Sequence, residues 1–186
     1  DILRVMAYLD IKKRSATDDL SEVDGLLRRV ERADGVRPLS DHLWIDLRQG
    51  GRPGFAGLLA YIPGHDHLVA YCQVSRGNDS WSLDLIVDPH HRYDMASIGP
   101  EMLAEAIRII RQEGGGHVHW WVYEPTQVHQ QLANSVKLVI SRTVTQMRVS
   151  LPLSQDVLAN TTQTETCAFR VGTDEQSWLD VNNRAF

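Results

Sequence analysis

The spacing of apolar residues changes along the chain and predicts alternating helices and strands. Between residues 20 and 30 apolar positions recur every three or four residues, which is the pattern of a helix that buries one face. The same spacing predicts a helix from about Ser97 to the glycines at 114–116, which end it. Shorter helices are expected over residues 42–47 and 125–133. The helical segments are therefore amphipathic and should pack against a common core.

Between these helices lie shorter apolar runs that read as strands. Their β-branched and aromatic residues and their flanking turn residues favour extended structure. A turn at residues 63–66 joins two of them into a hairpin. The expected strands are residues 11–13, 55–62, 67–76, 81–87, 117–123 and 138–150. This order of elements predicts an α/β domain.

Composition narrows the class of protein. The chain has 186 residues, which is enough for one domain and the start of another. Its net charge of −5 disfavours a nucleic-acid partner. No apolar run approaches the roughly 20 residues of a membrane span, so no membrane partner is expected. Cys72 and Cys167 are far apart, and Cys72 lies in an apolar run. We expect free thiols and a reducing cytoplasm.

The most informative segment is the strand, loop and helix from residue 80 to 113. Val87, Pro89 and Arg92 follow one another at the end of the strand, and Ser97-Ile98-Gly99 comes at the expected start of the helix. The first turn of a helix presents unpaired amides and a positive dipole end, which together hold phosphate. An ordinary strand-to-helix connection without a ligand is the alternative reading. Both readings stay open on the loop alone.

The order V-x-P-x-x-R, then small-x-Gly, then a helix resembles the acyl-CoA loop of the GNAT acetyltransferases. The family pattern would place its two glycines at Met95 and Ser97, so the match to Ser97-Ile98-Gly99 requires a two-residue insertion and Ser in place of one Gly. Three further segments resemble mycothiol synthases within that superfamily. They are residues 33–40 (ADGVRPLS), 138–153 with its Q-M-R and closing L-P-L, and 181–186 (VNNRAF).

The resemblance implies a GNAT fold, with a mixed, mostly antiparallel central sheet flanked by helices. It implies an acetyl-CoA-dependent N-acetyltransferase that acetylates a small-molecule amine, in mycothiol synthases the cysteinyl amine of a glucosamine–inositol conjugate. By the same resemblance, backbone groups of Leu85, Ile86 and Val87 pair with the pantetheine arm. Arg92 and the amides of Ser97, Ile98 and Gly99 hold the pyrophosphate.

Catalysis by this chain is a separate question. Asp84 lies on the central strand where many GNAT enzymes carry Glu, so it is the candidate proton acceptor. A solvent-facing strand carboxylate is its alternative reading. The Tyr acid of many family members would fall at Ala133, and it is therefore missing. The alternatives are thus a non-catalytic GNAT-like domain that supports a partner domain, and a free-standing GNAT enzyme for another amine.

Paired histidines raise the question of a metal. His65 and His67 flank a turn, His90 and His91 are adjacent, and residues 117 and 119 would share one strand face. No Cys or carboxylate falls at a supporting spacing, so the sequence predicts no metal site.

Two ends of the chain resemble each other. A strand, a Thr-Asp-acid cap and an amphipathic helix occur at residues 11–30, with Thr17-Asp18-Asp19, and again at 168–181, with Thr173-Asp174-Glu175. This similarity predicts a tandem repeat. The expected organisation is a GNAT-like domain at 1–153, a linker at 154–166, and the first strand and helix of a second repeat at 167–186. Mycothiol synthases similarly contain two GNAT repeats, with catalysis assigned to the second, so a second repeat in the same chain is an expected partner.

Overall fold

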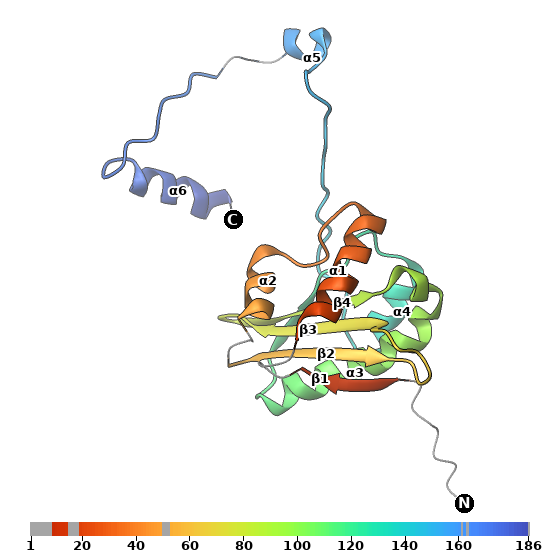
Figure 1. The fold of residues 1–186 in the computed structure, drawn as a ribbon. Helices are drawn as coiled ribbons and strands as arrows, with labels where there is room; N and C mark the ends of the chain where they lie inside the picture. Colours follow the sequence, from red (N-terminus) through yellow and green to blue (C-terminus); the bar gives the residue numbers. More distant parts are fainter. Residues whose placement is uncertain (1–8, 15–18, 50–52, 161, 163, 186) are drawn as a thin grey trace, which may run out of the picture. The chain divides into compact units, whose positions relative to one another are not determined.

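The computed structural model describes residues 9–14, 19–49, 53–160, 162 and 164–185 (Figure 1). The chain divides into two compact units, residues 1–141 and 142–186, which are described separately. Thr17 and Asp18, two of the expected capping residues, lie outside the described part. No helix in that part has the length and apolar content needed to cross a lipid bilayer.

The first unit is built on a five-stranded sheet in the order β1-β2-β3-β4-β5. Neighbouring strands are antiparallel except β4 and β5, which are parallel. This confirms the predicted mixed, mostly antiparallel sheet. The strands are β1 (Asp10–Lys13), β2 (Phe55–Tyr61), β3 (Ala70–Arg76), β4 (Ser80–Val87) and β5 (His117–Trp120).

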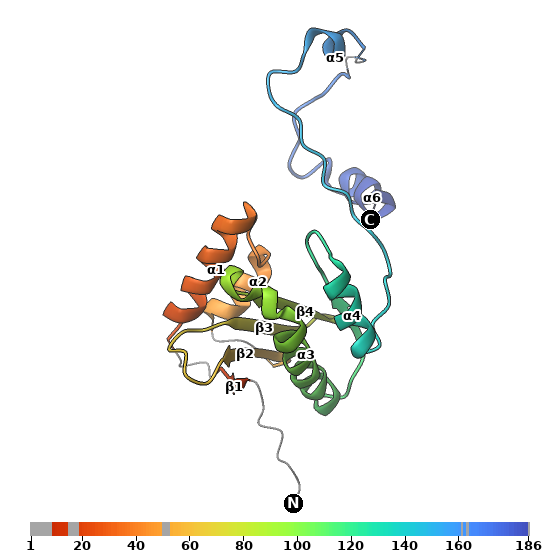
Figure 2. The same cartoon turned by 90° about the vertical axis from the view of Figure 1, so that its right-hand side faces the viewer.

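Helices cover both faces of the sheet (Figure 2). One face packs against α1 (Ser21–Asp34) and α2 (Asp41–Arg48), and the other against α3 (Met95–Gln112) and α4 (Gln127–Ser135). The apolar stripes predicted from the helical spacing are the buried stripes: Val23, Leu26, Leu27 and Val30 are all buried on α1. Covered on both faces, β3 is buried from Ala70 to Ser75, including Cys72, which is a free thiol as expected.

Successive side chains of β4 point alternately to the two helical layers. Leu83 and Val87 belong to the core beneath α3, whereas Ile86 belongs to the core beneath α1 and α2. Because successive side chains of a strand point to opposite faces, Asp84 shares the α1/α2 face with Ile86. The core therefore has two layers, and the candidate catalytic carboxylate lies in the α1/α2 layer.

The connection from β4 to α3 differs from the expected one. A 3-10 helix, η1 (Pro89–Asp94), follows β4 directly, and α3 begins at Met95, two residues before the expected start at Ser97. Asp88 makes this possible, because its carboxylate accepts the His90 amide at 2.9 Å and Pro89 needs no amide partner. The predicted loop is thus a helical turn that continues into α3.

Residues 138–150 were expected to form a strand, and this is wrong: all of them are described, and none is in a strand. A strand needs a hydrogen-bonded neighbour, and no strand of the described chain pairs with this segment. Its apolar side chains are exposed instead, at 84% for Val139 and 89% for Met147. The compact first unit ends at Ser141.

The second unit contains two helices, α5 (Gln155–Ala159) and α6 (Glu175–Ala185). Helix α5 falls inside the expected linker. Residues 168–171 form no strand, contrary to expectation, because no neighbouring strand is available to them. Helix α6 confirms the predicted amphipathic helix, and its apolar side chains, Trp178 among them at 57%, are exposed.

Candidate active site

Strands β4 and β5 separate partway along their length. Their parallel pairing ends at Leu83 and Trp120, after which β5 stops while β4 continues to Val87. The β5-facing side of Leu85, Ile86 and Val87 therefore has no strand neighbour in the described part of the chain. Backbone groups at such an edge are ready to pair with an extended ligand. This is the edge at which the family resemblance predicts the pantetheine arm.

Asp84 lies at the point where the two strands separate. Its side chain is partly buried, and its Oδ2 is buried without a hydrogen-bond partner among the described residues. The reading as a solvent-facing carboxylate is therefore wrong. Burial raises the pKa of Asp84 from 3.8 to about 7. A carboxylate with this pKa can accept a proton near neutral pH.

Neighbouring polar groups do not compensate for the burial of Asp84. Gln73 lies opposite it on β3, but the Gln73 amide is engaged elsewhere. Its oxygen accepts from the Tyr71 hydroxyl at 2.9 Å, and its nitrogen donates to the Leu43 carbonyl at 3.0 Å and to Ser75 Oγ at 3.4 Å. Because the oxygen and the nitrogen of the Gln73 amide both have other partners, this amide does not offset the desolvation of the Asp84 carboxylate.

Arg92 extends from η1 and meets the end of α1. Its two terminal nitrogens donate to the two carboxylate oxygens of Asp34, each at 2.7 Å, and this pair raises the pKa of Arg92. Asp34 is held there because Gly35, with φ +68°, ends α1 in the left-handed conformation. The cation expected to hold phosphate is thus already paired with a carboxylate.

A buried ion pair fixes η1 above the sheet. Asp88 is 2% exposed and accepts from Arg29 Nε of α1 at 2.6 Å and from the His90 amide. Burial alone would raise the pKa of Asp88, but the hydrogen bonds from His90 and Arg29 bring it below its ordinary value. The carboxylate therefore stays ionised and positions the turn that carries Arg92.

The three residues expected to hold pyrophosphate with Arg92 lie in the first turns of α3. Ser97 is exposed, whereas Ile98 and Gly99 are buried. A Cβ on Gly99 would come within 2.6 Å of Leu132 on α4, so this glycine allows two helices to approach closely. In a helix that begins at Met95, only the earliest amides lack a partner in the helix. Of the three, Ser97 lies nearest the start of the helix and is the exposed one.

The sequence reasoning did not identify His129. It lies in the first turn of α4, where its Nδ1 accepts the Thr126 amide at 3.1 Å, and its ring is 6.2 Å from that of Trp120. Burial, followed by the charge of Arg92, lowers its pKa. The signal was a capping box with His in place of the usual Glu or Gln. Ala133, at the position of the missing Tyr, lies one turn later on α4.

Solved structures share this fold. An aminoglycoside acetyltransferase from an uncultured soil metagenomic sample, in complex with sisomicin, matches with a TM-score of 0.55 and 16% identity, covering 77% of this chain and 97% of that one. Aminoglycoside N-acetyltransferase AAC(6')-Iy, in complex with CoA, matches with a TM-score of 0.51 and 12% identity, covering 76% and 94%. No protein-family model matches the chain. The fold is that of the GNAT superfamily of acetyltransferases.

Sequence similarity places the chain within that superfamily. It is 32% identical over 169 residues to the mycothiol acetyltransferase of Acidimicrobium ferrooxidans, covering 90% of this chain and 54% of that protein. It is 30% identical over 172 residues to that of Acidothermus cellulolyticus, covering 90% and 50%. The chain thus has the GNAT fold and resembles mycothiol acetyltransferases, and it spans about half the length of these relatives.

Proposed function

We propose that this chain is an acetyl-CoA-dependent N-acetyltransferase that acetylates a small-molecule amine. The observation that carries the proposal is the position of Asp84, partly buried with a pKa of about 7 where β4 and β5 separate. The similarity to mycothiol acetyltransferases supports a cysteinyl amine of a glucosamine–inositol conjugate as the acceptor. The CoA-bound structural neighbour supports the cosubstrate.

In the proposed complex the pantetheine arm pairs with the open edge of Leu85, Ile86 and Val87. The pyrophosphate lies against Arg92 and the 97–99 turn, where Ser97 offers its amide and the α3 dipole favours an anion. Arg92 reaches the phosphate by exchanging the Asp34 carboxylate for phosphate oxygens, since its fork fits either group. Because the ion pair with Asp34 must break first, Arg92 contributes less to acetyl-CoA affinity than an unpaired arginine would.

The reaction needs an acceptor for one proton and a donor for the leaving sulfur. The amine nitrogen attacks the thioester carbon, a C–N bond forms and the C–S bond breaks. Asp84 accepts the proton that the nitrogen loses, and the departing thiolate takes up a proton. His129 offers an Nε2–H donor one turn before Ala133, because its Nδ1 is occupied as an acceptor. It is our candidate for the role of the missing Tyr.

A second candidate is a GNAT domain without activity, which binds CoA weakly or only supports a catalytic repeat. Two observations favour it, the pairing of Arg92 with Asp34 and the lack of an acid side chain at Ala133. In this proposal the partner is a second GNAT repeat in the same chain, beginning in residues 167–186. The exposed apolar side chains of α6 would be buried within that repeat.

One experiment separates the candidates. Acetyl-CoA binding to the full chain is measured by calorimetry, and acetyl transfer to a panel of small amines is measured by release of the CoA thiol. We expect Asp84→Asn to lower the rate at least about 100-fold with unchanged acetyl-CoA affinity. Ser82→Ala, on the same face of β4, is the matched control and should retain the rate.

The outcomes are distinct. An unchanged rate in Asp84→Asn would refute the role of this carboxylate. Binding without transfer to any amine would favour the inactive domain. No heat at millimolar acetyl-CoA would exclude ligand binding by this chain and leave the supporting role alone.

A further inference from the structure

Three histidines that are separated in the sequence meet at one end of the sheet. His65 and His67 lie in the turn between β2 and β3, and His91 lies in η1. One potential ligand atom from each ring lies within 4.8 Å of the other two, and the Nε2 atoms of His67 and His91 are 2.9 Å apart. The three ring centroids are 5.1 to 5.7 Å from one another. Three imidazoles thus bring one potential ligand nitrogen each into the same small volume.

We infer that His65, His67 and His91 form a binding site for a divalent transition-metal ion of the zinc type, with one coordination position left open. A tetrahedral ion with Zn–N bonds of about 2.0–2.1 Å requires ligand nitrogens about 3.3 Å apart. The Nε2 atoms of His67 and His91 are 2.9 Å apart, and all three potential ligand atoms lie within 4.8 Å of one another, so the required distance falls in this range. Small rotations of the two exposed rings, His65 and His67, are enough to reach it.

Two of the three rings are close enough to hydrogen-bond to each other, through the Nε2 atoms of His67 and His91. His91 is 6% exposed, and its Nδ1 is buried without a hydrogen-bond partner among the described residues. Such a group costs roughly 1–3 kcal/mol when it is left unpaired. A bound ion would take lone pairs of the Nε2 atoms of His67 and His91 in place of their contact with each other.

The two segments that supply the ligands are anchored independently of any ion. The His91 amide donates to the Asp88 carbonyl at 2.8 Å, and Asp88 is held in turn by Arg29. In the turn, the His65 amide donates to the Ile62 carbonyl at 2.9 Å. Because the backbone on both sides is fixed, binding would order only a few side-chain torsions. The site is therefore largely preorganised.

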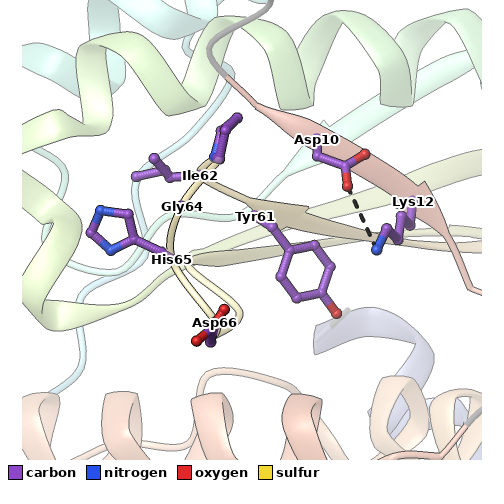
Figure 3. Close-up of a pocket in the computed structure, with 8 residues that line it drawn as sticks. Asp10, Lys12, Tyr61, Ile62, Gly64, His65 and Asp66 are labelled. Atoms are coloured by element: carbon purple, nitrogen blue, oxygen red, sulfur yellow. Dashed lines mark ion pairs between the residues drawn. The ribbon is translucent and has the colours of Figure 1, made fainter.

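The surroundings leave room for a fourth ligand. A cavity of about 430 Å³ opens beside His65, between the turn and β1 (Figure 3). Figure 3 shows Asp10 and Lys12 of β1 on one side of it and the turn that carries His65 and Asp66 on the other. Its lining residues are Asp10, Lys12, Tyr61, Ile62, Pro63, Gly64, His65 and Asp66. Because His65 and His67 are themselves exposed, water can reach an ion held by the three rings.

The donor set selects the ion. Imidazole suits Zn²⁺, Ni²⁺ and Cu²⁺, whereas Mg²⁺ and Ca²⁺ require oxygen ligands, which the three-histidine set does not include. A bound ion would also join the β2–β3 turn to His91 of η1. Arg92 is the residue that follows His91. Metal binding is therefore expected to stiffen the turn that bears this arginine. The inference does not depend on the proposed acetyl transfer.

Calorimetric titration of the full chelator-treated chain with ZnCl₂ tests the inference. All proteins carry Cys167→Ser, because this exposed thiol could bind zinc by itself. We expect one equivalent of Zn²⁺ to bind, a rise in melting temperature on saturation, and no response to MgCl₂. His65→Gln and His67→Gln should each weaken binding at least tenfold. Both side chains are exposed, so these variants should fold.

The matched control is a His117→Gln/His119→Gln double variant, which removes another pair of exposed histidines and should keep full affinity. Added Co²⁺ should give the visible absorption of a tetrahedral nitrogen site, and this absorption should vanish in His67→Gln. Absence of Zn²⁺ binding at 100-fold molar excess, or equal binding by the His65 and His67 variants and the parent, would overturn the inference.

Discussion

Replacing Asp84 with Asn should stabilise the protein at alkaline pH and have a smaller effect in acid. The carboxylate is partly buried, its Oδ2 has no hydrogen-bond partner among the described residues, and burial raises its pKa from 3.8 to about 7. Between these values the folded state holds a proton that the unfolded state has released. The free energy of unfolding of the wild type therefore falls as pH rises through this window.

The magnitude follows from the shift. About three pKa units at 1.36 kcal/mol each give a loss of about 4 kcal/mol above pH 8, relative to pH below 4. Between pH 5 and pH 8 about two units are traversed, which corresponds to about 3 kcal/mol. Asn cannot ionise, so the advantage of Asp84→Asn over the wild type should grow by this amount across that range.

Urea denaturation of both proteins at pH 5 and pH 8, followed by circular dichroism, measures this difference. Other titrating groups, including His91 and Asp88, are present in both proteins and cancel in the comparison. Ser82→Ala serves as a control that should show no pH-dependent change in relative stability. A difference between wild type and Asp84→Asn that is the same at both pH values would refute a desolvated carboxylate. It would show that water reaches Asp84 and that its pKa is ordinary.

Three further outcomes are expected. Asp34→Asn should raise acetyl-CoA affinity up to about fivefold in calorimetry, because Arg92 is released from a part-exposed ion pair worth about 1 kcal/mol; unchanged affinity would mean that Arg92 does not meet the ligand. Gly99→Ala should lower the free energy of unfolding by about 1 kcal/mol, since overpacking against Leu132 exceeds the gain in helix propensity; a Leu132→Ala background should abolish the loss. Asp88→Asn should cost about 2 kcal/mol at pH 7 by removing the acceptor that anchors η1 to α1. This cost should shrink as pH falls below about 4, because falling pH protonates the wild-type carboxylate through its lowered pKa; a cost at pH 3 as large as that at pH 7 would contradict it.

Local pattern was sufficient where each element's own residues decide its structure. The apolar spacing of α1 located both the helix and its buried face, and the spacing of α6 located that helix. The glycines after α3 ended it as expected. In these segments helix formation depends on side-chain periodicity, and helix termination depends on glycine. Both act over one or two turns, so the local sequence is enough to locate the helix and its end.

Residues 138–150 show where local pattern fails. Their alternating apolar residues favour a strand, yet strand formation depends on a hydrogen-bonded neighbour elsewhere in the chain. In the described structure no such neighbour exists, and the segment stays irregular and exposed. β-propensity describes how well a residue fits a sheet that is already present, so it could not settle this segment.

By itself the sequence determined the order of helices and strands, the GNAT-like strand, turn and helix around Arg92, and the candidate Asp84. It could not show that Arg92 is paired with Asp34, that Gly99 serves helix packing, or that Asp84 is desolvated. It also predicted no metal, whereas the fold brings His65, His67 and His91 together. Each of these features joins residues that are distant in sequence or depends on what covers them. Contacts between distant elements are set by tertiary packing, and residue spacing along one element does not specify them.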